Sequence, residues 1–318
     1  MQFLYVILSL VVGLIALGCG PSVEIGGRND AGTIVDGGVD TGYPPPREDY
    51  VLSVGSDDTL DLMTWNIENF PAQSSTPSLV ADIVTSLQMD VVAVQEITST
   101  QAFEEVAQRL PRHGARVSSH TYSDGSYQKV GVLFREDLMT PIDVRLLFPG
   151  SGYEFPRPPL QVTFEMKNAN DDPGWQLTLI TLHLKAGQNQ EDKLRRAGAM
   201  ELLEEHVRNL VEGPANDEII ILGDFNELLT DDDGRAVLGP FLVRPNDYRF
   251  QTEVLAEQGA KSFIYGERLI DHILTTSALD DNLQGRTAVI PNLEGQVPGY
   301  ASLLSDHLPV AISMPVFE

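Results

Sequence analysis

Cysteine is nearly absent from this 318-residue chain, because Cys19 is the only one. A single cysteine excludes a disulfide within the chain. Basic residues are also scarce: 21 Lys and Arg stand against 46 Asp and Glu, which gives a formal net charge of -25. This excess of acidic residues disfavours tight non-specific binding to nucleic acid or anionic membranes, because both kinds of binding depend on a basic surface. It still suits an enzyme that recruits divalent cations, because carboxylates bind hard cations.

Long hydrophobic runs are lacking except at the N-terminus, where residues 3–17 are almost entirely apolar. This run is shorter than the roughly 20 residues of a spanning helix and is typical of a signal peptide, which we predict over residues 1–18. The letters ALGC at residues 16–19 resemble the cleavage box of bacterial lipoproteins. Lipidation of Cys19 would hold the protein on a membrane outside the cytoplasm. Plain secretion and an uncleaved anchor are the alternatives.

Residues 19–49 are rich in Gly, Asp and Pro and show neither helical nor strand periodicity. We interpret this segment as a solvated tether that follows the lipidated cysteine. Residues 50–318 contain no internal repeat and no second linker, and 42% of the whole chain is hydrophobic. That content is enough for a sizeable core, so we predict one catalytic domain over residues 50–318.

Helical and strand patterns interleave along this domain. Apolar residues at helical spacing predict helices over 76–89, 101–110 and 191–212, the last ended by Gly213-Pro214. Apolar or alternating runs predict strands over 60–67, 90–97, 129–136, 160–167, 175–184, 218–226, 269–276 and 306–314. Because several strands follow one another directly, we expect mixed sheets with helices outside them.

Polar side chains recur near one tip of these apolar strands. They are Asn66, Glu96, His183, Asp224, Asn226, Asp271, Asp306 and His307. If the tips gather at one end of the sheets, these residues line a single pocket. Its carboxylates, carboxamides and imidazoles, without a thiolate, suit Mg²⁺ or Mn²⁺ rather than structural zinc.

Six short motifs resemble the endonuclease/exonuclease/phosphatase superfamily, which includes the DNase I-like and exonuclease III-like enzymes. In chain order they are WNIEN (65–69), QE (95–96), HLK (183–185), GDFN (223–226), DHI (271–273) and SDH (305–307). The resemblance implies a four-layer α/β sandwich, with two packed, mixed and mostly antiparallel sheets flanked by helices. It also implies Mg²⁺-dependent hydrolysis of a phosphoester.

The same resemblance assigns metal ligands to three positions. Glu96 would be the central ligand, with Asn66 and Asp306 close to the ion. Oxygen ligands of this kind, together with retained water, are what Mg²⁺ prefers.

Five further positions receive catalytic roles from the resemblance. His307 would be the general base or the electrostatic partner of the attacking water, oriented by Asp271. Asp224 and Asn226 would position the water or the leaving group. His183 would donate to a phosphate oxygen in the transition state.

Four other polar residues near the motifs have weaker signals. Lys185 and Arg196 are candidate contacts for substrate phosphate, with a solvated helix or loop face as the alternative. Ser305 does not lie in a GxSxG nucleophile elbow, so a serine triad is not expected. His272 should point to the opposite face of its strand from Asp271 and is interpreted as structural.

These observations favour an extracytoplasmic nuclease, with either endo- or exonuclease action on DNA or RNA, that is monomeric and has no protein partner. Contact with a membrane would occur only through lipid at Cys19. A phosphatase or phosphodiesterase acting on a phospholipid head group or small phosphoester is the first alternative. A non-catalytic binding module on the same fold is the second.

Overall fold

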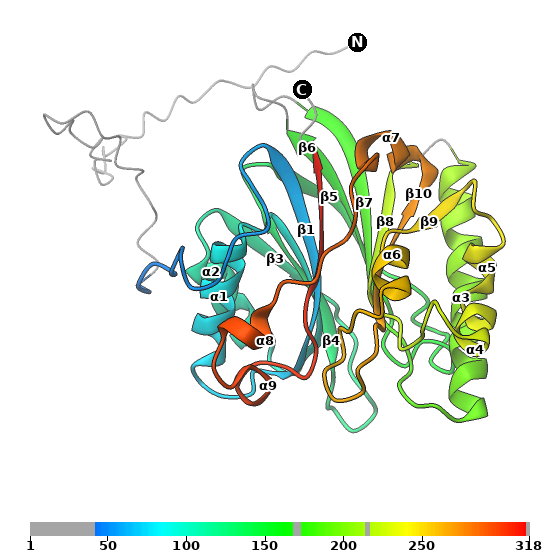
Figure 1. Ribbon diagram of the computed structural model, residues 1–318, viewed down its shortest axis with the longest axis horizontal. Helices are drawn as coiled ribbons and strands as arrows, with labels where there is room; N and C mark the ends of the chain where they lie inside the picture. The colour runs from blue at the N-terminus through cyan, green and yellow to red at the C-terminus, as the bar shows by residue number, and fades with distance from the viewer. Residues whose placement is uncertain (1–41, 168–172, 214–216, 316–318) are drawn as a thin grey trace, which may run out of the picture. The chain divides into compact units, whose positions relative to one another are not determined.

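Two β-sheets pack face to face in the computed structural model, which describes residues 42–167, 173–213 and 217–315 (Figure 1). The strand order is β11-β1-β2-β4-β3 in the first sheet and β5-β6-β7-β8-β10-β9 in the second. Only β1–β2 and β7–β8 are parallel neighbours, and the other pairs are antiparallel. The prediction of two mixed, mostly antiparallel sheets is therefore confirmed. The strands are β1 (Thr59–Phe70), β2 (Val91–Ile97), β3 (His113–Val117), β4 (Lys129–Arg135), β5 (Met139–Leu146), β6 (Leu160–Lys167), β7 (Pro173–His183), β8 (Ile219–Asp224), β9 (Tyr248–Phe250), β10 (Asp271–Thr276) and β11 (Val310–Pro315).

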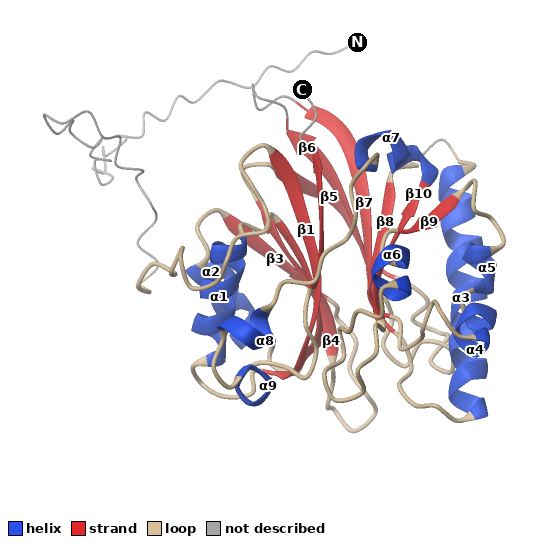
Figure 2. Ribbon diagram, in the orientation of Figure 1, coloured by secondary structure: helices blue, strands red, loops and turns tan. Residues whose placement is uncertain are grey.

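Helices cover the outer faces of both sheets, as Figure 2 shows. Helices α1, α2 and α8 lie outside the first sheet, and α3, α4 and α5 lie outside the second. The long predicted helices are confirmed as α1, α2 and α3. The bounds are α1 (Thr76–Leu87), α2 (Thr100–Arg109), α3 (Gln190–Val211), α4 (Asp232–Val237), α5 (Gly239–Leu242), α6 (Glu253–Glu257), α7 (Asp280–Leu283), α8 (Leu293–Gln296) and α9 (Tyr300–Leu303), with a 3₁₀ turn at Ser277–Leu279.

Three hydrophobic clusters fill the spaces between these layers. Strand β1 contributes to two of them, because successive side chains of a strand point to opposite faces. Leu62 faces the cluster between the sheets, while Met63 and Trp65 face the cluster under α1 and α2. Between the sheets, the rings of Phe134 and Phe164 lie 5.1 Å apart. Burial on both faces explains why the central strands read as nearly continuous apolar runs.

A buried polar link joins the two sheets next to their polar tips. The Gln95 side chain of β2 donates to Thr64 Oγ1 of β1 and to Thr181 Oγ1 of β7, each at 3.1 Å. All three side chains are buried. Because an unsatisfied buried amide is costly, this link favours one alignment of the sheets over shifted ones.

The folded part begins earlier than residue 50. The Arg47 backbone N–H donates to Asp82 of α1 at 2.8 Å, and the Arg109 guanidinium of α2 lies 4.1 Å from the Tyr43 ring centre. Residues 43–49, predicted as tether, therefore pack on helices, and Thr41–Glu318 forms one compact unit.

The predicted signal peptide (1–18), Cys19 and the tether up to residue 41 lie outside the described residues. Within the described ranges, no helix combines the length and apolar character needed to cross a bilayer.

Candidate active site

The polar strand tips gather at one end of the two sheets. Each sheet contains one parallel pair, and parallel strands end at the same edge. In the first sheet Asn66 is paired with Gln95, the neighbour of Glu96. In the second sheet His183 is paired with Asp224, and Asp224 is paired with Asp271 of the antiparallel strand β10. The predicted convergence therefore follows from the strand register.

The first sheet supplies a group of carboxylates and amides. Glu96 accepts from the Asn69 backbone N–H at 2.9 Å, and Asn66 Nδ2 lies 3.4 Å from its other oxygen. The Asp306 backbone N–H donates to Glu68 at 3.2 Å. The Glu96 and Asp306 side chains keep 16% and 21% of their surface exposed, so both can meet a ligand from solvent.

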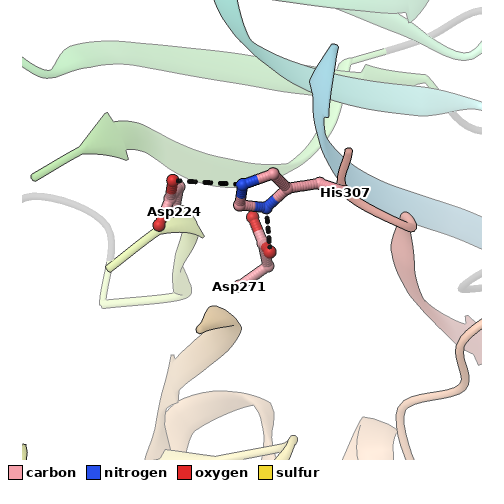
Figure 3. Close-up of side chains that lie close together, drawn as sticks. All are labelled: Asp224, Asp271 and His307. Atoms are coloured by element: carbon pink, nitrogen blue, oxygen red, sulfur yellow. Dashed lines mark hydrogen bonds and ion pairs between the residues drawn. The ribbon is translucent and has the colours of Figure 1, made fainter. Parts of the chain in front are cut away.

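Three buried residues, Asp224, Asp271 and His307, each offer a ligand atom within 4.8 Å of the other two (Figure 3). His307 Nδ1 lies 2.7 Å from Asp271 Oδ2, which is a hydrogen bond. On the other side of the ring, His307 Nε2 lies 4.0 Å from Asp224 Oδ2. The imidazole comes from the loop before β11 of the first sheet, and both carboxylates come from the second sheet. The carboxylate of Asp271 thus fixes the ring orientation.

The electrostatic environment keeps the proton on His307. Burial acts to lower its pKa, but the carboxylates of Asp271, Asp224 and Asp306 outweigh burial and raise the pKa to about 10. Burial also raises the pKa of Asp224 to about 7, assisted by repulsion from Asp271. In the metal-free protein the imidazole is therefore protonated at neutral pH. Of its two predicted roles, this state fits the electrostatic partner better than the free base.

His183, unlike His307, is in an environment that favours the neutral imidazole. Its Nε2 atom lies 3.4 Å from Asp224 Oδ2 and 3.9 Å from Glu96 Oε1. Burial holds its pKa well below the usual range, and the positive charges of Arg157 and His307 lower it further. A neutral imidazole can still donate one N–H, and the contact of His183 with a phosphate oxygen stays a prediction.

The backbone at the strand tips is strained. Four non-glycine site residues have positive φ angles: Glu68 (32°), Asn69 (48°), Glu96 (65°) and Asn226 (54°). Such angles are uncommon outside glycine and persist only where the surroundings impose them, which happens most often at functional sites. The four strained residues all lie at or next to the polar strand tips.

The donor set at the first sheet fits a divalent cation. Burial raises the pKa of Glu68, and repulsion from Asp306 raises it further. Burial likewise raises the pKa of Asp306, despite His307, and repulsion from Glu96 adds to the effect. A cation would relieve this repulsion. Glu96 and Asp306 would hold it, with Glu68 at its edge, and a bound cation would polarise a phosphoryl oxygen or the attacking water.

Asn66 makes hydrogen bonds toward both sheets, and its role as a metal ligand stays a prediction. Its Oδ1 atom accepts from the Glu68 backbone N–H at 3.1 Å, and its Nδ2 atom donates to Asp224 at 3.1 Å. The amide therefore orients carboxylates of both sheets around the pocket. The Asn226 backbone N–H donates to Asp224 Oδ1 at 2.9 Å, so Asn226 also supports that carboxylate.

A family profile described as the Endonuclease/Exonuclease/phosphatase family matches residues 63–307, which include the whole site. The chain belongs to this family. Members of the family are generally hydrolases of phosphoesters, typically dependent on divalent metal. No curated protein sequence matches the chain.

Solved structures of this family share the fold at low identity. D. rerio TDP2 complexed with a single-strand DNA product has 15% identity and a TM-score of 0.59, covering 82% of this chain and 100% of that one. A mannosyl-6-phosphatase of Bacteroides thetaiotaomicron has 16% identity and a TM-score of 0.58, covering 81% and 100%. The human Nocturnin catalytic domain with bound sulfate has 17% identity and a TM-score of 0.58, covering 82% and 95%.

The structure corrects the interpretation of Arg196 as a substrate contact. Its side chain is fully buried, with Nη2 2.6 Å from Glu227 Oε1. It also donates to the carbonyl oxygens of Lys185 and Gly187 at 2.6 and 2.8 Å. Arg196 thus ties helix α3 to the loop after β7 and does not face substrate. The alternative, that Arg196 lies on a solvated face, is also wrong, because the side chain is buried.

Lys185 remains at the surface of the same loop. Its side chain is 30% exposed, and Nζ lies 3.0 Å from Asp192. An arriving phosphate would compete with this carboxylate for the ammonium group, so a contact between Lys185 and substrate stays a prediction.

Arg157 is a site residue that we did not predict. The guanidinium is buried and donates to the His183 and Leu184 carbonyl oxygens and to Gln128 at 3.3, 2.7 and 2.9 Å. Gln128 in turn donates to Asn69 Oδ1 at 2.8 Å. This chain of hydrogen bonds connects the tips of β1 and β7. The segment Arg157-Pro-Pro-Leu before an apolar strand was the available signal.

Ser305 and His272 both make structural contacts, and such a role was predicted for His272. Ser305 donates to the Asn66 carbonyl oxygen at 2.6 Å and accepts from the His307 backbone N–H at 2.9 Å, so its hydroxyl holds the loop. His272 is buried, with its ring nitrogens 2.8 Å from Thr252 Oγ1 and 3.0 Å from the Glu227 carbonyl oxygen.

Proposed function

We propose that this protein is a divalent-metal-dependent phosphodiesterase that cleaves nucleic acid, with Mg²⁺ or Mn²⁺ as its ion. The observation that carries the proposal is the adjacency of two groups at one end of the sheets. A carboxylate cluster suited to a cation (Glu96, Asp306) lies beside a protonated imidazole held by Asp271. Hydrolysis of a phosphoester needs a positioned water and stabilisation of charge on oxygen, and these groups supply both.

A nucleic acid substrate is supported by one relative on this fold, D. rerio TDP2, which was solved with a single-strand DNA product. The net charge of -25 favours a second candidate, hydrolysis of a small phosphomonoester, because long-range repulsion would slow approach of a polyanion. The mannosyl-6-phosphatase on the same fold supports this alternative.

The first experiment is a substrate panel on purified residues 41–318. Supercoiled plasmid, a single-stranded oligonucleotide, bis(p-nitrophenyl) phosphate and mannose 6-phosphate are each incubated with Mg²⁺, with Mn²⁺ and with EDTA. We expect hydrolysis of the nucleic acids that stops in EDTA and is lost in the His307→Ala variant, which also controls for contaminating nuclease.

Each other outcome changes a different part of the proposal. Hydrolysis of mannose 6-phosphate alone would keep the site and replace the substrate class. Activity that persists in EDTA would remove the metal from the mechanism. No hydrolysis of any phosphoester by folded protein would favour the non-catalytic binding module.

We also propose that the protein acts outside the cytoplasm as a lipid-anchored monomer, on the basis of the apolar run at residues 3–17 and the ALGC sequence. Metabolic labelling of the full chain with radioactive palmitate in a bacterial host checks this. We expect label in the natural chain and none in Cys19→Ser. Equal labelling of both, or secretion of both without label, would contradict lipidation at Cys19.

A further inference from the structure

A groove lies at the free edge of the second sheet, away from the active site. Its main hollow has a volume of about 500 Å³, and an adjoining hollow of about 270 Å³ shares Arg249, Gln251 and Arg286 with it. In Figure 1 the edge strand β9 lies between α7 and α5, next to this region. We call it the edge groove, lined by Arg235, Phe241, Arg249, Gln251, Val254 and Arg286.

The edge groove is separate from the catalytic pocket. Strand β10 connects them: Asp271 begins the strand at the active site, and Thr276 ends it opposite Tyr248 of β9. At a rise of about 3.4 Å per residue, the two ends of β10 are roughly 17 Å apart. A ligand in the groove therefore would not touch the catalytic residues.

Three arginines converge on the main hollow in a chain that has few basic residues. Arg249 is partly neutralised, with Nε 3.4 Å from Asp280 Oδ1, and Arg235 donates to the Leu229 carbonyl oxygen at 3.2 Å. Within the described part of the chain, no side chain or carbonyl oxygen pairs with the Arg286 guanidinium. The acids at the groove are Glu253 beside the main hollow, and Asp280 and Asp281 beside the smaller one. The main hollow thus has an excess of positive charge, and guanidinium groups bind phosphate and carboxylate through paired hydrogen bonds.

One wall of the groove is apolar. Phe241, Leu242 and Val254 line the hollow, and Val254 is 43% exposed. Next to them, Val243 is 76% exposed. A concave site of this volume, with apolar walls and a few convergent polar groups, is typical of binding sites for small molecules.

We propose that the edge groove binds a small organic phosphate, with the phosphate on Arg249 and Arg286 and an aromatic or apolar body against Leu242 and Val254. The apolar wall is the reason for choosing an organic phosphate over inorganic phosphate. The arginines are the reason for choosing it over a neutral ring compound. This site does not depend on the catalytic function proposed above.

Isothermal titration with AMP as the probe tests the proposal. Residues 41–318 carrying His307→Ala are used in EDTA, so that neither turnover nor a metal-bound phosphate contributes. We expect one AMP site, at least tenfold weaker binding of adenosine and of inorganic phosphate, and a five- to tenfold loss of AMP affinity in Arg249→Gln and in Arg286→Gln. The matched control is Arg145→Gln, because Arg145 is an exposed arginine, ion-paired with Asp143, on the opposite edge strand β5.

Circular dichroism of each variant shows whether it is folded. The Val254→Asp variant provides a second test that leaves the arginines intact. Because it places a negative charge in the groove, it should also weaken AMP binding. Any of three results would overturn the proposal. The first is that AMP does not bind, and the second is that folded Arg286→Gln and Val254→Asp bind AMP as tightly as the parent protein. The third is that Arg145→Gln loses as much AMP affinity as the groove variants. Loss of AMP binding on adding Glu96→Gln, with the groove variants unaffected, would place the ligand in the catalytic pocket instead.

Discussion

Replacing Glu96 with glutamine is expected to reduce metal-dependent phosphoester hydrolysis by at least about 100-fold without unfolding the domain. Glutamine keeps the size of the side chain and can still accept from the Asn69 N–H, but it removes the charge that would hold the cation. A cation contributes several kcal/mol to stabilising charge in the transition state, and each ~1.4 kcal/mol changes the rate tenfold. Steady-state rates, together with titration of Mn²⁺ into the apo protein, measure both effects.

Glu104→Gln is the matched control for this variant, because it removes one exposed carboxylate of α2, the helix that follows β2. We expect it to change neither turnover nor Mn²⁺ affinity. If folded Glu96→Gln binds Mn²⁺ and turns over like the natural protein, then the assignment of Glu96 as the central ligand is wrong.

The second large effect is expected from Asp271→Asn. This change removes the buried charge nearest to the His307 imidazole, at 2.7 Å, and leaves a neutral group of the same size. Its carboxylate favours the protonated ring, so its removal should lower the pKa of His307 from about 10. Where a carboxylate orients a catalytic imidazole, the amide replacement costs up to about 10⁴-fold in turnover, and we expect a loss of about 10²- to 10⁴-fold here.

NMR titration of the histidine ring resonances in metal-free protein separates this role from a structural one. In the natural protein, the His307 signals should titrate near pH 10, and in Asp271→Asn they should titrate at lower pH. A folded Asp271→Asn protein with an unchanged His307 titration and normal turnover would show that the pair has no catalytic importance.

Most of the fold could be predicted from the sequence because the central strands are buried on both faces and therefore read as apolar runs. The strands that the sequence did not reveal are β3, β5 and β9, and all three lie at sheet edges. Every residue of β3 is only half-buried, and β5 contains Pro141 at a register shift, which a pattern search reads as a break. Edge strands bury less apolar surface, so their signal is weak.

The site could be predicted where its residues sit at strand tips, since the strand register brings those tips together. Arg157 was missed because its partners include backbone carbonyls and Gln128, 29 residues away, and the Arg157-Pro-Pro-Leu segment by itself does not indicate such contacts. Arg196 was misassigned for a related reason. Its buried partner Glu227 is 31 residues away, so nothing near Arg196 in the sequence distinguishes a buried ion pair from a solvated or phosphate-binding arginine.

The division of the site between two sheets also bears on folding. Glu96 lies on the first sheet and His307 on the loop before its strand β11, while Asp224 and Asp271 belong to the second sheet, and the Gln95 amide joins the two sheets. A folding intermediate with only one sheet formed would contain half of the catalytic groups. The proposed site is therefore complete only when the two sheets are docked, so any hydrolysis would report on the integrity of the interface between them rather than on secondary structure.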